Sequence, residues 1–130
     1  MKTPQTPKNF EEYYEKGIRY SLAFKDEKAI LAFTKAIKLN PNCAKAYLHR
    51  AQSKNTISDE EGALEDYTKT IELEPENYSA YYDRGLLKFE LGDKKSGRAD
   101  MKKGKEMLND KLRWQRDKEK IDRKASRDRI

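Results

Sequence analysis

Apolar and polar positions alternate along most of the chain at the spacing of an α-helix. In the first segment Tyr14, Ile18 and Leu22 recur every four residues, and charged residues stand between them. Valine is absent, so one of the main strand-forming residue types is missing. Short polar turns at Lys25-Asp26, Ser58-Asp59 and Gly92-Asp93 divide the helical pattern into pairs of segments. The pattern therefore predicts an all-α fold built from helical hairpins.

The same residue types return at an interval of 34 residues, three times in succession. Small residues occupy the same place in each unit, and so do large ones. The columns are Tyr13, Tyr47 and Tyr81; Gly17, Ala51 and Gly85; Ala29, Ala63 and Gly97; Phe33, Tyr67 and Met101; and Pro41 and Pro75. A period of this length is typical of a repeat protein in which hairpins stack on one another.

This pattern resembles the tetratricopeptide repeat (TPR), whose signature is an aromatic residue followed by Gly or Ala, Tyr, Ala, Phe and Pro. The first two units depart from it mainly at Lys16 and Lys54. In the third, Gly97, Gly104 and Asn109 stand where Ala, Ala and Pro are usual. The resemblance implies an α-α superhelix, which divides the chain as follows: a disordered lead-in at 1–9, TPR 1 at 10–43, TPR 2 at 44–77, a degenerate TPR 3 at 78–111, and a charged C-terminal capping helix at 110–130.

The small and the proline columns have a physical reason that is independent of the family. Small residues are expected where the two helices of a hairpin cross, because a longer side chain would hold the backbones apart. Pro41 and Pro75 follow the second helix of their units, since proline lacks an amide donor and restricts its predecessor. Three hairpins and one cap make seven helices.

The charge of the chain is concentrated at its C-terminal end. Residues 94–130 contain fifteen Lys and Arg against seven Asp and Glu, while residues 1–93 contain fourteen against sixteen. From Asp110 onward the run has no Gly or Pro, which predicts a helix. Met107, Leu108 and Leu112 are expected to pack on the third hairpin and close its apolar end.

This basic end raises nucleic-acid association as an alternative function. Its charges alternate in sign along the sequence, and it lacks a series of aromatic residues interleaved with the bases for base stacking, so a solvated helix face is the preferred interpretation. Self-association through the groove or through this helix is a further possibility.

The sequence contains few of the side chains that catalytic sites usually combine. There is one histidine and one cysteine, and no glycine-rich phosphate loop. We therefore predict no enzyme activity, no metal site and no cofactor. The acidic run that begins at Asp59 is interpreted as a helix start. With no apolar run of about 20 residues and no signal peptide, a soluble, cytoplasmic protein with no membrane partner is expected.

The predicted function is that of a non-catalytic adaptor or scaffold, which binds a peptide or helix of another protein. In the TPR family the first helix of each hairpin lines a concave groove. First helices here carry a second apolar stripe besides the one used for stacking, and two stripes imply two surfaces to bury. The resemblance places these residues in the groove: Tyr14, Ile18, Leu22, Leu48, His49, Gln52, Asn55, Tyr82, Leu86 and Phe89.

One class of partner is predicted to be excluded. Family members that hold chaperone tails of the EEVD type resemble one another in a clamp of Lys, Asn and Arg side chains. The matching positions here carry other residues, namely Tyr14, Ile18, His49, Ser79 and Asp83.

Overall fold

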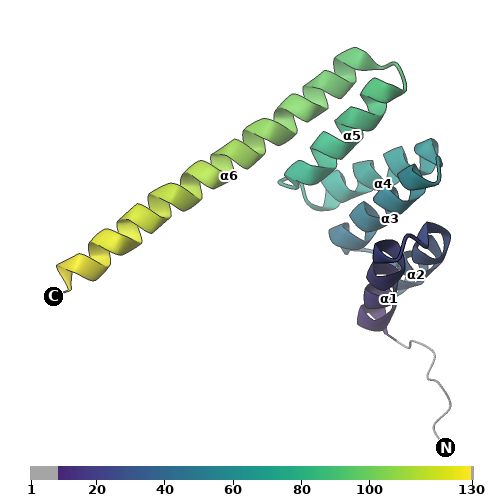
Figure 1. Ribbon diagram of the computed structural model, residues 1–130, viewed down its shortest axis with the longest axis horizontal. Coiled ribbons are helices and arrows are strands. Elements are labelled where there is room, and N and C mark those ends of the chain that lie inside the picture. The colour runs from purple at the N-terminus through teal and green to yellow at the C-terminus, as the bar shows by residue number, and fades with distance from the viewer. Residues whose placement is uncertain (1–8, 130) are drawn as a thin grey trace, which may run out of the picture.

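Three helical hairpins stack side by side, and the last helix continues far beyond them. The computed structural model describes residues 9–129, in which 34-residue units follow one another as expected (Figure 1). The helices are α1 (Phe10–Leu22), α2 (Asp26–Leu39), α3 (Ala44–Thr56), α4 (Glu60–Leu73), α5 (Tyr78–Glu90) and α6 (Lys94–Asp128). The all-α superhelical fold predicted from the sequence is confirmed.

Polar side chains define where three of the helices begin. Asn9 accepts a hydrogen bond from the Glu12 amide of α1 at 2.9 Å, and Asn77 does the same for α5. Asp59 accepts from the Gly62 amide at 3.1 Å, so the acidic run there caps α4 as predicted. Apart from Asn9, the predicted lead-in at 1–9 lies outside the described residues.

The prediction of seven helices is wrong, because the described residues contain six. α2 and α4 end two residues before Pro41 and Pro75, but the corresponding residue of the third unit is Asn109, whose amide can continue the helix. α6 therefore runs through the expected turn as one helix of 35 residues.

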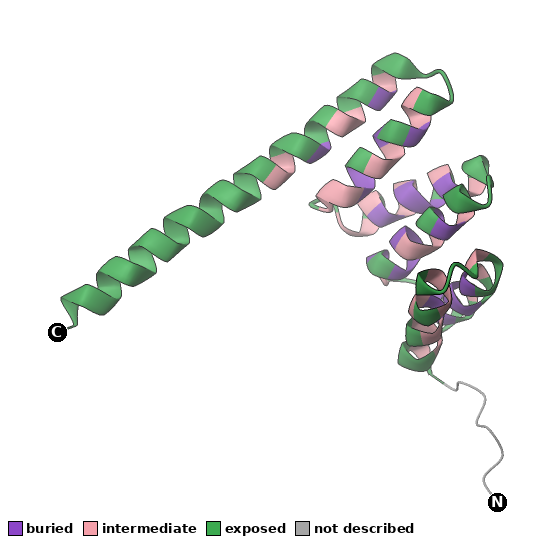
Figure 2. Cartoon of the chain, in the orientation of Figure 1, coloured by how far each residue is buried: buried purple, intermediate pink, exposed green. Residues whose placement is uncertain are grey.

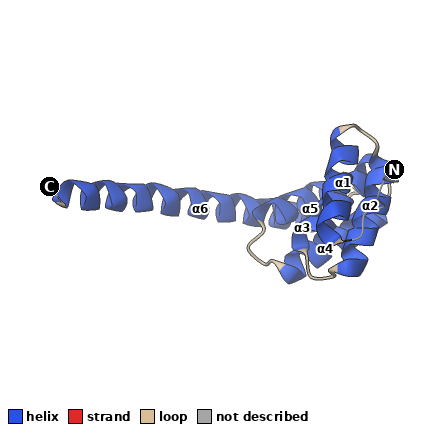
Figure 3. Ribbon diagram, turned by 90° about the horizontal axis from the view of Figure 1, so that it is seen from below, coloured by secondary structure: helices blue, strands red, loops and turns tan. Residues whose placement is uncertain are grey.

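The segment predicted to be a cap does not fold back on the third hairpin. Met107 and Leu108 are half-buried, whereas Leu112 is 47% exposed. Every residue from 109 to 129 is exposed, and this segment, called the α6 tail below, projects away from the hairpins (Figures 2 and 3). The tail is helical as predicted, but its large apolar residues Leu112, Trp114 and Ile121 are exposed and do not close the third hairpin.

The hairpin core is built from the repeated small and large residues. Ala29 and Ala63 are completely buried beside Phe33 and Tyr67, which are 0% and 2% exposed. Each following hairpin places its first helix against the second helix of the one before, so α3 packs on α2 and α5 on α4. Stability therefore comes from stacking as well as from each hairpin.

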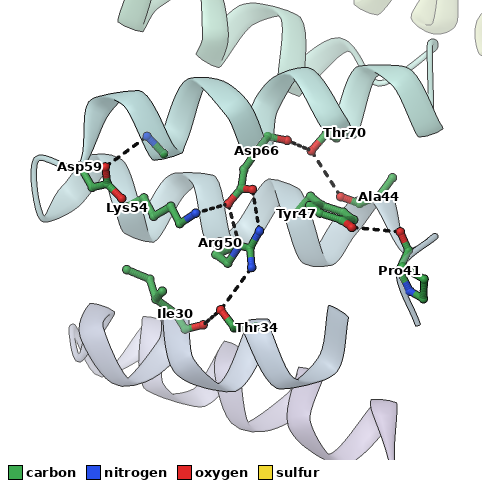
Figure 4. Close-up of polar contacts among 11 residues, drawn as sticks. Ile30, Thr34, Pro41, Ala44, Tyr47, Arg50, Lys54, Asp59, Asp66 and Thr70 are labelled. Atoms are coloured by element: carbon green, nitrogen blue, oxygen red, sulfur yellow. Dashed lines mark hydrogen bonds and ion pairs between the residues drawn. The ribbon is translucent and has the colours of Figure 1, made fainter. Parts of the chain in front are cut away.

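An ion-pair network joins helices within and between repeats. Nε and one terminal nitrogen of Arg50 donate to the two carboxylate oxygens of Asp66 at 2.7 and 2.8 Å, and Lys54 lies 3.1 Å from Asp66 (Figure 4). Arg50 also donates to Thr34 Oγ1 in the preceding hairpin at 3.2 Å. This explains why Lys54 departs from the aromatic residue of the first unit.

The same network recurs 34 residues later in the third unit. Arg84 is 2.8 Å from Asp100, Lys88 is 2.9 Å from it, and Arg84 donates to Thr68 at 3.4 Å. The first unit has Ala32 at the place of the aspartate, so it has no such network.

Candidate functional site

A hollow of about 720 Å³, called the central hollow below, opens between the first helices of the hairpins and the start of the α6 tail. It combines aromatic and aliphatic side chains with charges of both signs. Its lining residues are Tyr14, Lys45, Leu48, His49, Glu74, Glu76, Asn77, Tyr78, Ser79 and Lys111.

A second hollow of about 320 Å³, the α5–α6 pocket, adjoins the central hollow through Tyr78 and Ser79, which line both. Gly104 of α6 is buried beneath it, and Leu108 forms part of its wall. Its lining residues are Tyr78, Ser79, Tyr82, Asp83, Gly104, Lys105 and Leu108. Together the two hollows form a continuous surface from α1 to α6.

Four of the ten groove residues predicted from the sequence line these hollows. They are Tyr14, Leu48 and His49 in the central hollow and Tyr82 in the α5–α6 pocket. The other six line neither hollow: Ile18, Leu22, Gln52, Asn55, Leu86 and Phe89.

Three of these six residues are exposed or contact other side chains instead of lining the hollows. The side chain of Leu22 is 76% exposed at the end of α1. Gln52 donates to Asp83 at 3.2 Å, which links α3 to α5. The Phe89 ring faces cations of α6, with Lys94 Nζ at 5.7 Å and Arg98 Cζ at 5.5 Å from its centroid.

Tyr14 and Leu48 also contribute to packing. The Tyr14 ring centroid lies 5.7 Å from that of Phe10, 6.0 Å from Phe33 and 5.9 Å from His49. Leu48 is only 9% exposed and belongs to a core cluster shared by the second and third hairpins. The wall of the central hollow on this side is therefore held rigidly.

Burial shifts two titratable groups along this surface. It lowers the pKa of His49, and the positive charge of Lys45 acts in the same direction, although a hydrogen bond with Gln52 opposes both. Burial raises the pKa of Asp83, against the opposing effect of the hydrogen bond from Gln52. Both shifts have burial as their main cause, which disfavours the charged form of each side chain.

Tyr78, Leu108 and Lys111 are among the lining residues that sequence reasoning missed. Tyr78 stands 68 residues after Phe10 in the repeat, and this column of first-helix residues could have identified it. Leu108 and Lys111 line the hollows only because α6 continues straight past α5. The spacing of residues in the sequence does not predict that Leu108 and Lys111 line the hollows.

Side chains that could bind a metal ion do not cluster in the described part of the chain. No group of three or more His, Cys, Asp or Glu side chains among residues 9–129 is placed to hold a metal ion. Within the same range, no helix combines the length and the apolar character needed to cross a bilayer.

Comparison with known proteins gives structural neighbours but no sequence match. No protein-family model matches the chain, and no curated protein does. A crystal structure of MamA superposes with a TM-score of 0.77 at 28% identity, covering 81% of this chain and 61% of that chain. The Arabidopsis OM64 TPR domain superposes with a TM-score of 0.71 at 30% identity, covering 73% of this chain and 78% of that chain.

A third neighbour is the first TPR of Spaghetti (RPAP3) bound to the HSP90 peptide SRMEEVD. It has a TM-score of 0.74 at 23% identity, covers 76% of this chain and 79% of that chain, and at this identity it shows the fold alone. The present chain spans about three fifths of the MamA structure, namely 61% of its length.

Proposed function

Because this chain belongs to the tetratricopeptide repeat family, we propose that its concave surface binds a peptide or an amphipathic helix of a partner protein. In this proposal the chain acts as a non-catalytic protein-interaction module. The specific proposal is that the ligand lies along the central hollow and places an apolar side chain in the α5–α6 pocket.

The observation that carries this proposal is the continuous surface formed by the two hollows. Tyr78 and Tyr82 stand on one face of α5, and Leu108 of α6 lies opposite them in the same pocket. Tyr82 is 36% exposed, so its ring is available to a ligand. Helices that bind in grooves use apolar anchors at i and i+4, a spacing that fits a surface with two adjoining apolar sites.

The charged residues around the central hollow would orient the ligand. Lys45 and Lys111 are on its border together with Glu74 and Glu76, so neither sign dominates. Such a border adds specificity more than affinity, because exposed charges contribute little binding energy. The proposed ligand is accordingly apolar in its anchors and mixed in charge elsewhere.

The test uses a peptide selected from a random display library on the full chain, with its affinity measured by calorimetry. Tyr82→Ala is expected to weaken binding about five- to a hundred-fold, the equivalent of roughly 1–3 kcal/mol for a central anchor. Leu91→Ala is the matched control, because Leu91 is 46% exposed at the other end of α5 and lines neither hollow. If both variants bind every selected peptide with equal affinity, the peptide does not bind at this surface and the proposal is wrong.

The SRMEEVD peptide provides a separate prediction about the class of ligand. Tyr14, His49 and Ser79 occupy clamp positions of the central hollow without supplying a cationic side chain, and Asp83 places a carboxyl group in the adjoining pocket. We expect no micromolar binding of SRMEEVD by calorimetry under conditions in which a selected apolar peptide binds. Micromolar binding of SRMEEVD would contradict this exclusion.

Nucleic-acid association is the second candidate function, and it uses a different surface. One observation favours it: in the helical α6 tail, bases that alternate with acids along the sequence gather on one side of the helix. This surface does not overlap the α5–α6 pocket.

A further inference from the structure

The charges of the α6 tail separate around the helix although they are mixed along the chain. At about 100° per residue, six bases fall within a sector of about 100°, and no acid lies among them. They recur at helical spacings of three and four residues over about 21 Å of the helix axis. These residues, called the basic stripe below, are Arg113, Arg116, Lys120, Arg123, Lys124 and Arg127.

The acids of the tail lie outside this sector. Asp110, Asp117 and Asp128 follow one edge of it, Glu119 lies beyond the other edge, and Asp122 lies on the opposite side of the helix. Among residues 9–129, two stripe residues have an acidic partner within 4 Å: Arg113 with Asp110 and Arg123 with Glu119, both at 3.8 Å. These pairs are highly exposed, so they compete weakly with a strong polyanion.

The stripe continues toward the N-terminal end of α6. Lys95 and Lys102 stand at seven-residue intervals in the column that leads through Asn109 to Arg116 and Arg123, and residues seven apart lie on nearly the same side of a helix. Glu106 lies on this side as well, 3.9 Å from Lys102, so the extension is less basic than the stripe itself. Both lysines are exposed, since α5 packs on the side of α6 that carries the buried Gly97 and Gly104. The basic face therefore points away from the hairpins.

We propose that the basic stripe binds duplex DNA through its phosphate backbone. This inference deepens the second candidate function and is independent of the peptide groove. Duplex DNA presents a regular line of closely spaced negative charges, and a helix with bases on one face complements it without reading its sequence. The major groove of B-DNA is also about 12 Å wide, enough to admit an α-helix.

A membrane surface fits the tail less well. Helices that lie in a bilayer interface need an apolar face next to their bases. Here Trp114 and Ile121, which are 62% and 67% exposed, continue the column of Asp100 and Met107 on the side of α6 that faces α5. Asp110, Asp117 and Asp128 lie between these two side chains and the basic stripe, so acids interrupt the apolar face that a lipid surface would need.

Single-stranded nucleic acid and acidic proteins also fit less well. Binding of single strands relies on aromatic side chains among the bases, and the stripe contains none. The Lys118 ammonium lies 5.3 Å from the centroid of the Trp114 ring, on the other side of the helix. An acidic polypeptide would need to hold its charges in a straight line for about 21 Å, which duplex DNA does without ordering.

The experiment measures the affinity of the full chain for a fluorescent 20-base-pair DNA duplex by anisotropy between 50 and 200 mM salt. If each stripe residue contacts one phosphate, the logarithm of the association constant should fall with the logarithm of the salt concentration with a slope of about −5. Lys120→Gln/Arg127→Gln is expected to weaken binding about ten- to a hundred-fold at 50 mM salt and to reduce the slope by about two.

The matched control is Lys118→Gln/Arg129→Gln. It removes one Lys and one Arg from the same tail and gives the same net charge, but its residues lie outside the stripe. We expect its affinity to stay within about three-fold of the original chain. Circular dichroism checks that both variants keep their helix content, which Gln favours as much as Lys.

Three outcomes would overturn the proposal. The first is an equal loss in both double variants, which would indicate attraction by net charge without a defined face. The second is tighter binding to polyglutamate or to phosphatidylserine vesicles than to the duplex. The third is the absence of duplex binding at 50 mM salt. This outcome would not contradict the proposed peptide binding, whose test uses a different ligand and different variants.

Discussion

Replacing Asp66 by asparagine is expected to lower the free energy of unfolding by about 2–4 kcal/mol. The Asp66 side chain is only 5% exposed, and it neutralises Arg50 and Lys54, whose side chains are 15% and 17% exposed. Asparagine keeps the shape of the side chain but leaves two cations without a counter-charge in a poorly solvated position. The partial exposure of both cations keeps the expected cost below that of a completely buried pair.

Chemical denaturation of the full chain, followed by circular dichroism, measures this loss. Glu72→Gln is the control on the same helix, because the Glu72 side chain is 61% exposed and lies 3.8 Å from Lys69. An exposed pair of this kind contributes at most about 1 kcal/mol. If Asp66→Asn costs no more than Glu72→Gln, the network does not stabilise the joint between repeats.

The hairpins could be predicted from the sequence because stacking repeats the same physical requirement every 34 residues. A large residue at Phe33 or Tyr67 fills the space beside a small residue at Ala29 or Ala63, and each position returns in the next unit. The Arg–Asp–Lys network follows the same period, but the family signature does not include it. Lys54 therefore departs from the family signature in the sequence, and only the structure shows that it pairs with Asp66.

The path of the last helix could not be predicted in the same way. Helical periodicity says that residues 110–128 form a helix, but it does not say whether that helix turns back or continues. Asn109 in place of proline removes the local stop, and the loss of one stop changes the direction of twenty residues.

The groove was predicted in part for a related reason. Tyr14 and Tyr82 follow from the spacing of the first helices, whereas Leu108 and Lys111 reach the hollows only because α6 is straight. The basic stripe depends on the same helix. Bases and acids that alternate along the sequence fall on different sides of a helix with 3.6 residues per turn.

In the third hairpin the backbones of α5 and α6 approach each other so closely at Gly85 and Gly97 that neither position has room for a Cβ atom. A Cβ atom on Gly85 would lie 2.5 Å from the Gly97 carbonyl oxygen and 2.6 Å from the Met101 amide nitrogen, and both are backbone atoms. A Cβ atom on Gly97 would lie 2.6 Å from the Gly85 carbonyl oxygen. In the second hairpin the same two columns hold Ala51 and Ala63, so a hairpin of this family can also form with a methyl group on each helix.

Gly85→Ala is therefore expected to lower the free energy of unfolding by about 1–3 kcal/mol, because α5 and α6 must move apart. This loss should appear although alanine favours a helix over glycine by about 1 kcal/mol. Once the helices have separated, the second methyl group meets less resistance, so Gly85→Ala/Gly97→Ala should cost at least about 0.5 kcal/mol less than the sum of the two single variants. Denaturation curves of the four proteins of this cycle measure both quantities. A stabilising effect of Gly85→Ala, of the size given by helix propensity alone, would contradict the close crossing and indicate that the hairpin already has room for the methyl group.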